Sequence, residues 1–233
     1  MGSLLETLVS DLMTNPDASI RVQSAYDIGE YQFFQGIDYL KKALWKDSEA
    51  LVRVACMMAL HKLEGDAVTD ELIKVYNEQK EHLVRFYAID LLAKIGNEKA
   101  REELIKAMDT EEDEKIKELI VFSLARLKEK NAREKMLKIL EENKEKPRIL
   151  ERAVEYFIYL KDKKVKKVIE KYKEHDYLPL KAKTYFYLAI LGDKETLKAI
   201  ENEEIEINND ISIVLNGKVY RGNTVFKKAL KEI

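Results

Sequence analysis

The stretch Glu49-Ala50-Leu51-Val52-Arg53 decides the fold, because its pattern recurs along the chain in strict register. The pattern is an acidic residue, two variable residues, an aliphatic residue and a basic residue. It returns every 32 residues, and a fixed period of this length indicates a chain built from repeats. The four copies occupy residues 17–21, 49–53, 81–85 and 113–117.

Apolar residues keep the same period in the stretches between these copies. They come in pairs four residues apart, as Leu40 and Leu44 do, and this spacing predicts the buried stripe of a helix. We call the helices predicted from these pairs the A helices. The first positions are Leu8, Leu40, Leu72, Leu104, Met136, Val168 and Ile200, and the second positions are Leu12, Leu44, Tyr76, Met108, Leu140 and Tyr172.

Each copy of the acidic-to-basic pattern opens a second helix, which we call a B helix. In the second repeat Val52, Cys56 and Leu60 fall on one narrow stripe, since each residue turns a helix by about 100°. Proline is tolerated in a first helical turn, and glycine commonly ends a helix. Pro16, Pro147 and Pro179 precede or open B helices, and Gly65, Gly96 and Gly192 close B helices.

Two helices per period and about six periods predict an all-α solenoid of stacked helical hairpins. The aliphatic-basic pair with an acid four residues before the base resembles the HEAT-repeat family. The short period and alanine-rich B helices are similar to the HEAT-like repeats first noted in phycobilisome lyases. This resemblance covers residues 1–200 and implies that B helices line the concave side of the solenoid.

The resemblance also implies that acidic and basic columns form a ladder between repeats. The fifth repeat departs from the pattern, with Leu150 in the basic column and Lys146 in the acidic one, so we expect the ladder to weaken there. The ladder residues are Asp17, Arg21, Glu49, Arg53, Glu81, Arg85, Asp113 and Lys117.

The last segment, residues 201–233, follows a different pattern. Residues 211–220 alternate around Asn216-Gly217, which predicts a β-hairpin, and a final helix is expected over 225–233. We expect this segment to pack on the sixth repeat as a cap, because a lone hairpin is marginally stable in water. The alternative is a docking edge for a partner.

Composition narrows the class of protein. Charged residues make up 36% of the chain, the net charge is −2, and there is one cysteine. A generic nucleic-acid binder is more basic, and a disulfide framework needs more cysteines. With no apolar run long enough to span a membrane, we expect a cytoplasmic protein. The high Glu and Lys content also fits a thermophile.

Residues that carry chemistry are sparse. The three histidines show no metal-ligand spacing, and no glycine-rich phosphate loop occurs. Cys56 falls in an apolar column, which predicts a buried thiol. The lysine-rich stretch 161–173 is interpreted as a solvated face, with a phosphate- or acid-binding patch as the alternative. We therefore predict no catalytic residues, no metal and no cofactor.

Two columns on the B helices point away from the A helices and are mostly aromatic or aliphatic. Either they form a binding face, or a tightly curved solenoid covers them with neighbouring repeats. The residues predicted to bind a partner are Tyr26, Val54, Met58, Phe86, Phe122 and Phe186.

These patterns predict a non-enzymatic interaction module or scaffold that binds a peptide, helix or protein along the concave B-helix face. The alternative is an enzyme or enzyme subunit on a HEAT-like scaffold, of the lyase-associated or DNA-repair glycosylase type. A third alternative is end-to-end self-association through the tail, although a monomer is favoured.

Removing residues 207–233 tests the predicted cap. We expect the truncated protein to aggregate or to melt at a lower temperature, because the apolar end of the sixth repeat loses its cover. Light scattering and thermal unfolding measure both effects. A truncated protein that stays monomeric and equally stable would show that the tail has another purpose.

Overall fold

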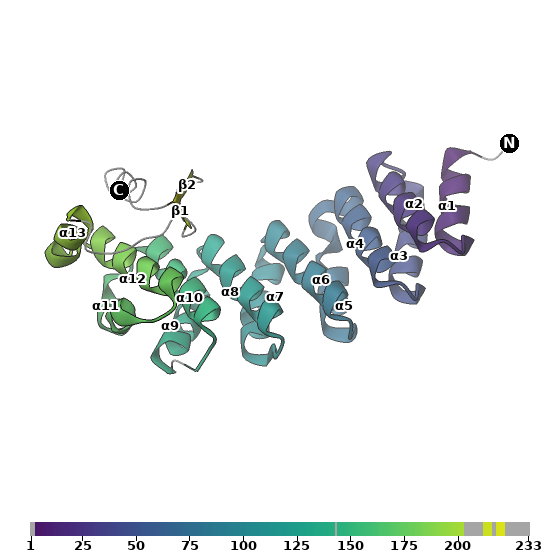
Figure 1. Cartoon of the computed structure of the whole chain (residues 1–233). Helices are drawn as coiled ribbons and strands as arrows, with labels where there is room; N and C mark the ends of the chain where they lie inside the picture. Colours follow the sequence, from purple (N-terminus) through teal and green to yellow (C-terminus); the bar gives the residue numbers. More distant parts are fainter. Residues whose placement is uncertain (1–2, 143, 203–211, 216–217, 222–233) are drawn as a thin grey trace. The chain divides into compact units, whose positions relative to one another are not determined.

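The computed structural model describes residues 3–142, 144–202, 212–215 and 218–221. The chain forms two compact units, one ending at Asp109 and the other beginning at Thr110. Figure 1 shows that helices come in consecutive pairs within each unit. The predicted boundary between a repeat domain and a capping segment near residue 200 stays a prediction.

The first unit contains three hairpins, each with an A helix followed by a B helix. The B helices α2, α4 and α6 pack side by side, with α4 between the other two (Figure 1). Each A helix packs on the B helix of its own hairpin. The hairpins are α1 (Leu4–Thr14) with α2 (Ala18–Glu30), α3 (Ile37–Lys46) with α4 (Ala50–Glu64), and α5 (Thr69–Glu78) with α6 (His82–Ile95); α7 (Glu98–Thr110) follows.

In the second unit, α10 lies between the B helices α8 and α12. The predicted sixth A helix is broken into α11 and a 3₁₀ turn on each side, η4 and η5. Lys163, Lys167 and Lys171 lie four residues apart there, and like charges at this spacing destabilise a helix. The elements are α8 (Glu114–Arg126), α9 (Arg133–Glu142), α10 (Pro147–Leu160), η4 (Lys163–Val165), α11 (Lys166–Ile169), η5 (Glu170–Glu174), α12 (Leu178–Ile190) and α13 (Lys194–Glu201).

The predicted apolar columns form the core. All seven first positions of the A helices are buried except Val168, which is half-buried, and all six second positions are buried. In α4, Val52, Cys56 and Leu60 are fully buried. Burial raises the pKa of the Cys56 thiol, which therefore stays protonated as a small core residue.

Every B helix of the described repeats is followed by a residue in the left-handed region. Gly65, Gly96 and Gly192 take this position in three repeats, as predicted. In the other repeats Gln32, Lys128 and Lys161 adopt positive φ angles of 54°, 50° and 49°. The predicted proline positions also hold, since Pro16 precedes the N-cap of α2 and the other two prolines lie in the first turns of α10 and α12.

Two short strands follow the last helix. β1 (Ser212–Leu215) and β2 (Lys218–Arg221) pair antiparallel, with Ser212 opposite Arg221 and Leu215 opposite Lys218. The predicted turn residues Asn216 and Gly217 and the predicted helix 225–233 lie outside the described residues. The capping role has no support in the described residues and stays a prediction.

The left-handed positions give a stability test. Gly65 has φ 56° and ψ −130°, and an added Cβ would meet no atom within 4 Å. Gly65→Ala therefore acts through the backbone alone, and we expect it to lower the free energy of unfolding by about 1–3 kcal/mol. Lys128→Gly is the control, because it should leave stability unchanged or raise it by up to about 1 kcal/mol. Thermal unfolding measures both, and equal melting of Gly65→Ala and the parent would contradict the backbone assignment.

Candidate partner-binding face of the B helices

In the first unit, apolar side chains line the B helices on the side predicted to face a partner. Tyr26, Met58 and Phe86 come from α2, α4 and α6, and each is half-buried. The Tyr26 hydroxyl donates a hydrogen bond to the Met58 sulfur at 3.4 Å, and the Phe86 ring stacks on His82 with centroids 6.0 Å apart. Leu51, which lies on the same stripe of α4 as Met58, is 62% exposed. We call Tyr26, Leu51, Met58 and Phe86 the apolar row.

Two of the six residues predicted to bind a partner are core residues instead. Val54 is 3% exposed and Phe186 is fully buried, so their predicted exposure is wrong. Val54 lies on α4, which packs between α2 and α6. Phe186 lies on α12, which packs against both α10 and η5. Phe122 is half-buried, and the side chains of Arg126 and Arg152 lie over its ring.

Four of the predicted ladder residues, Arg21, Arg53, Glu81 and Lys117, make ion pairs between repeats. Arg21 binds both carboxylate oxygens of Asp47, at 2.7 and 3.0 Å, instead of Glu49 two residues later. Burial by itself raises the pKa of Asp47, but the hydrogen bonds from Arg21 and from the Glu49 amide, together with the charges of Arg21 and Arg53, hold that pKa below its ordinary value. Arg53 pairs with Glu81 at 2.9 Å, as the column pattern suggests.

The remaining ladder residues have two kinds of contact. Arg85 and Lys117 bind groups outside their own helices, and Asp17 and Asp113 cap helices. Arg85 donates to the Tyr76 carbonyl oxygen at 3.4 Å and lies over the Tyr76 ring. Asp17 and Asp113 accept hydrogen bonds from the first-turn amides of α2 and α8, as N-caps do. Lys117 pairs with Glu145, one residue before Lys146, at 2.5 Å, so the fourth repeat still has an ionic contact with the fifth. Leu150, in the basic column of the fifth repeat, is a core residue and cannot continue the ladder.

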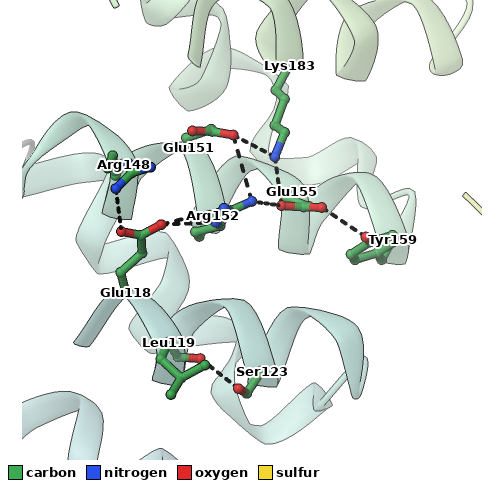
Figure 2. A network of polar contacts seen from close by, with 9 residues as sticks. All are labelled: Glu118, Leu119, Ser123, Arg148, Glu151, Arg152, Glu155, Tyr159 and Lys183. Atoms are coloured by element: carbon green, nitrogen blue, oxygen red, sulfur yellow. Dashed lines mark hydrogen bonds and ion pairs between the residues drawn. The ribbon is translucent and has the colours of Figure 1, made fainter. Parts of the chain in front are cut away.

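In the second unit, a charged network joins three B helices (Figure 2). Lys183 of α12 reaches between Glu151 and Glu155 of α10, at 2.7 Å from each carboxylate. Arg152 binds Glu155 at 3.0 Å and Glu118 of α8 at 3.5 Å. We call Glu118, Arg148, Glu151, Arg152, Glu155, Tyr159 and Lys183 the ionic network.

Burial and pairing act against each other in this network. Lys183 and Glu155 are each 1% exposed. Burial raises the pKa of Glu155, but Lys183 and then Arg152 outweigh burial, so the net pKa lies below the ordinary value. The Tyr159 hydroxyl donates to Glu155 at 2.9 Å, and burial raises the pKa of Tyr159. The three acids of the network are matched in number by three bases, of which Lys183 is buried, Arg152 is half-buried and Arg148 is exposed.

The ionic network was not predicted from the sequence. Glu118 and Glu151 occupy the column that holds Val54 in the second repeat. This change from an apolar to an acidic residue could have indicated a polar contact there. Lys183 is one of two lysines in the first half of α12, between Ala182 and Thr184. Only the packing of α12 on α10 shows that this lysine meets those acids.

The other chemistry-bearing residues do not converge. His61 is half-buried on α4, His82 stacks on Phe86, and His175 accepts a hydrogen bond from the Tyr177 amide at 3.0 Å. His175 also lines a cleft of about 500 Å³ together with Leu140, Glu141, Lys171, Tyr172, Glu174 and Asp176. Over the part of the chain that the structure describes, no three His, Cys, Asp or Glu side chains are grouped to hold a metal ion. Within the same ranges, each helix is too short or too polar to cross a lipid bilayer.

Paired helices at a fixed period, with B helices packed side by side, define an all-α helical-repeat protein of the solenoid class. The sequence model described as HEAT repeats matches residues 5–92 and 69–156, more than half of the chain. The chain therefore belongs to the HEAT-repeat family. A search of curated proteins found no match.

Among solved structures, the chain is similar to one in the complex of CpcE and CpcF of phycocyanin lyase from Nostoc sp. PCC7120. The identity is 20%, the TM-score is 0.53, and the match covers 87% of this chain and 82% of the other. Human deoxyhypusine hydroxylase in complex with glycerol matches at 14% identity and a TM-score of 0.42, over 82% of this chain and 89% of the other. The first similarity concerns the fold alone.

Lys183→Met tests the ionic network. It leaves Glu151 and Glu155 buried with too little positive charge, and removing one partner of a buried pair costs about 3–5 kcal/mol. We expect a loss of unfolding free energy of that size at pH 7. Lys144→Met removes a lysine side chain that is 79% exposed, and should change stability by less than about 0.5 kcal/mol.

The pH dependence of the stability loss in Lys183→Met distinguishes the loss of charge pairing from the loss of packing. In the parent, the lowered pKa of Glu155 contributes stability above the unfolded-state pKa, and this contribution is lost as pH falls through the folded-state value. In Lys183→Met, burial is opposed less strongly, so Glu155 takes up a proton at a higher pH. The deficit of the variant should therefore shrink as pH falls from 7 toward 4 in denaturant titrations. A deficit that is constant with pH would show that lost packing is the cause.

Proposed function

We propose that this chain is a non-enzymatic protein-binding module, and that the apolar row of the first unit holds a segment of the partner. One observation carries the proposal: three adjacent B helices each present an accessible apolar side chain on the same stripe. Accessible apolar patches of this kind commonly mark sites of interaction. Aromatic and methionine side chains are well suited to such a site, because methionine adapts its shape and aromatic rings supply large contact areas.

The spacing of the row suggests the size of the occupant. Neighbouring helices lie roughly 10 Å apart, so the row from α2 to α6 is about 20 Å long. A helix of about 13 residues has that length. An amphipathic helix laid along the row would place an apolar side chain against each B helix, which is a common mode of peptide recognition.

The fold comparison supports a protein partner, because the similar chain belongs to a complex of CpcE with CpcF. At 20% identity it supplies no residue roles. The enzyme or enzyme-subunit alternative would be favoured by turnover with a cofactor. The cytoplasmic location, the monomeric state and the capping tail stay predictions.

Tyr26→Ser with Phe86→Ser tests the apolar row. The partner is first captured from source cells, identified and purified, and its dissociation constant is then measured by calorimetry. We expect at least tenfold weaker binding, since interface energy concentrates in a few aromatic anchors. The matched control is Phe34→Ser with Tyr39→Ser, which removes two exposed aromatic rings from the first unit away from the B-helix stripe.

Thermal unfolding of the same variants decides whether the rings are surface or core. A buried phenylalanine costs about 3–5 kcal/mol when truncated, whereas half-buried rings should cost clearly less. If the Tyr26 and Phe86 variant binds the partner as tightly as the parent does, the proposal is wrong. A melting temperature far below that of the parent would also contradict it, because the rings would then be core residues.

A further inference from the structure

The outward stripe of the B helices changes character in the second unit. In α4 the stripe reads Leu51, Val54, Met58 and Lys62 at positions i, i+3, i+7 and i+11. The same positions in α8 are Lys115, Glu118, Phe122 and Arg126, and in α10 they are Arg148, Glu151, Glu155 and Tyr159. At the positions of Leu51, Val54 and Met58, α8 and α10 therefore carry charged residues, with the exception of Phe122.

The two signs of charge lie at different depths. The acidic side chains are covered, with exposed fractions of 19% for Glu118, 10% for Glu151 and 2% for Glu155. The Arg148 side chain is 67% exposed, and Lys115 and Arg126 are exposed as well. A partner that approaches this stripe therefore meets mainly positive charge.

Phe122 lies between two guanidinium groups. Arg126 lies 5.6 Å and Arg152 4.7 Å from the centre of the ring. Stacking of this kind restrains a long side chain, and a restrained guanidinium loses less freedom when it binds a carboxylate. Phe122, one of the residues predicted to bind a partner, is thus a support for arginines rather than an open apolar anchor.

We propose that the exposed Lys115, Arg126 and Arg148 form a basic face that binds an acidic protein segment, one rich in Asp or Glu, while Arg152 stays paired with the acids beneath. This inference rests on the proposed function and adds the chemistry of the partner. Arginine favours planar, bidentate contacts with carboxylates. A nucleic acid would present a continuous line of phosphates, which calls for a longer basic surface than two helices with carboxylates beneath them.

Fluorescence anisotropy tests the basic face with a labelled twelve-residue peptide of alternating Glu and Ala, at 50 mM NaCl. We expect binding by the parent and at least tenfold weaker binding by Arg126→Gln with Arg148→Gln. The matched control, Lys138→Gln with Lys144→Gln, removes two exposed cations from elsewhere in the same unit and should stay within twofold of the parent. A Gln-Ala peptide of equal length should not bind, and raising the salt to 200 mM should weaken the parent.

Three outcomes would overturn the inference: no binding of the Glu-Ala peptide, an equal loss in both double variants, or tighter arginine-dependent binding of a twelve-nucleotide single-stranded DNA. Melting curves show whether the variants stay folded, and Arg126→Lys should restore part of the affinity lost with glutamine. The Tyr26 and Phe86 variant should bind the peptide as the parent does. A negative result with the Glu-Ala peptide would therefore not contradict partner binding at the apolar row of the first unit.

Discussion

The structure depends on the burial of apolar stripes that no single hairpin can cover. An A helix covers one side of its B helix, and the rest of the B helix needs the B helices of neighbouring repeats. The helix α4 shows the result, because it lies between α2 and α6 and buries nine of its fifteen residues. In α2, which packs on one described B helix, only four of thirteen residues are buried. Neighbours, rather than local sequence, complete the core.

Polar contacts between repeats fix how the hairpins stack. Apolar packing alone tolerates small shifts of one repeat along the next. The Arg21–Asp47 and Arg53–Glu81 ion pairs form in only one alignment of the neighbouring repeats. In the second unit Lys183 meets two carboxylates of α10 at equal distances. Such a buried pair adds little net stability compared with apolar residues, but a shift of α12 by one residue would leave the lysine and both acids unpaired. The network therefore requires one alignment of α12 on α10 for all of its charges to be paired.

The same constraint determines which B-helix residues remain accessible. Within α4, Val54 is covered by neighbouring helices, whereas Leu51 in the first turn stays open. What a repeat places at those open positions then decides what it can bind. The first unit places aromatic rings, methionine and leucine there, and the second unit places arginine and lysine above buried acids.

Much of the fold could be predicted from the sequence, because helix formation and the apolar stripe depend on local spacing. The 32-residue period predicted the hairpins, and the columns of Leu8 and Leu12 predicted the A-helix core. The glycines and prolines predicted where helices end and begin. The broken sixth A helix was missed, since its lysine spacing was interpreted only as a solvated face.

The candidate site was predicted less well, because accessibility depends on distances between helices that are far apart in sequence. Of the residues predicted to bind a partner, Tyr26, Met58 and Phe86 are half-buried, while Val54 and Phe186 are buried. The sequence by itself determined the repeat, its period and which faces are apolar, because these follow from the turn of a helix per residue. Only the tertiary structure decided that Arg21 binds Asp47 and that Lys183 lies between Glu151 and Glu155. Those choices depend on the depth and angle at which one hairpin packs on the next, and no local pattern encodes them.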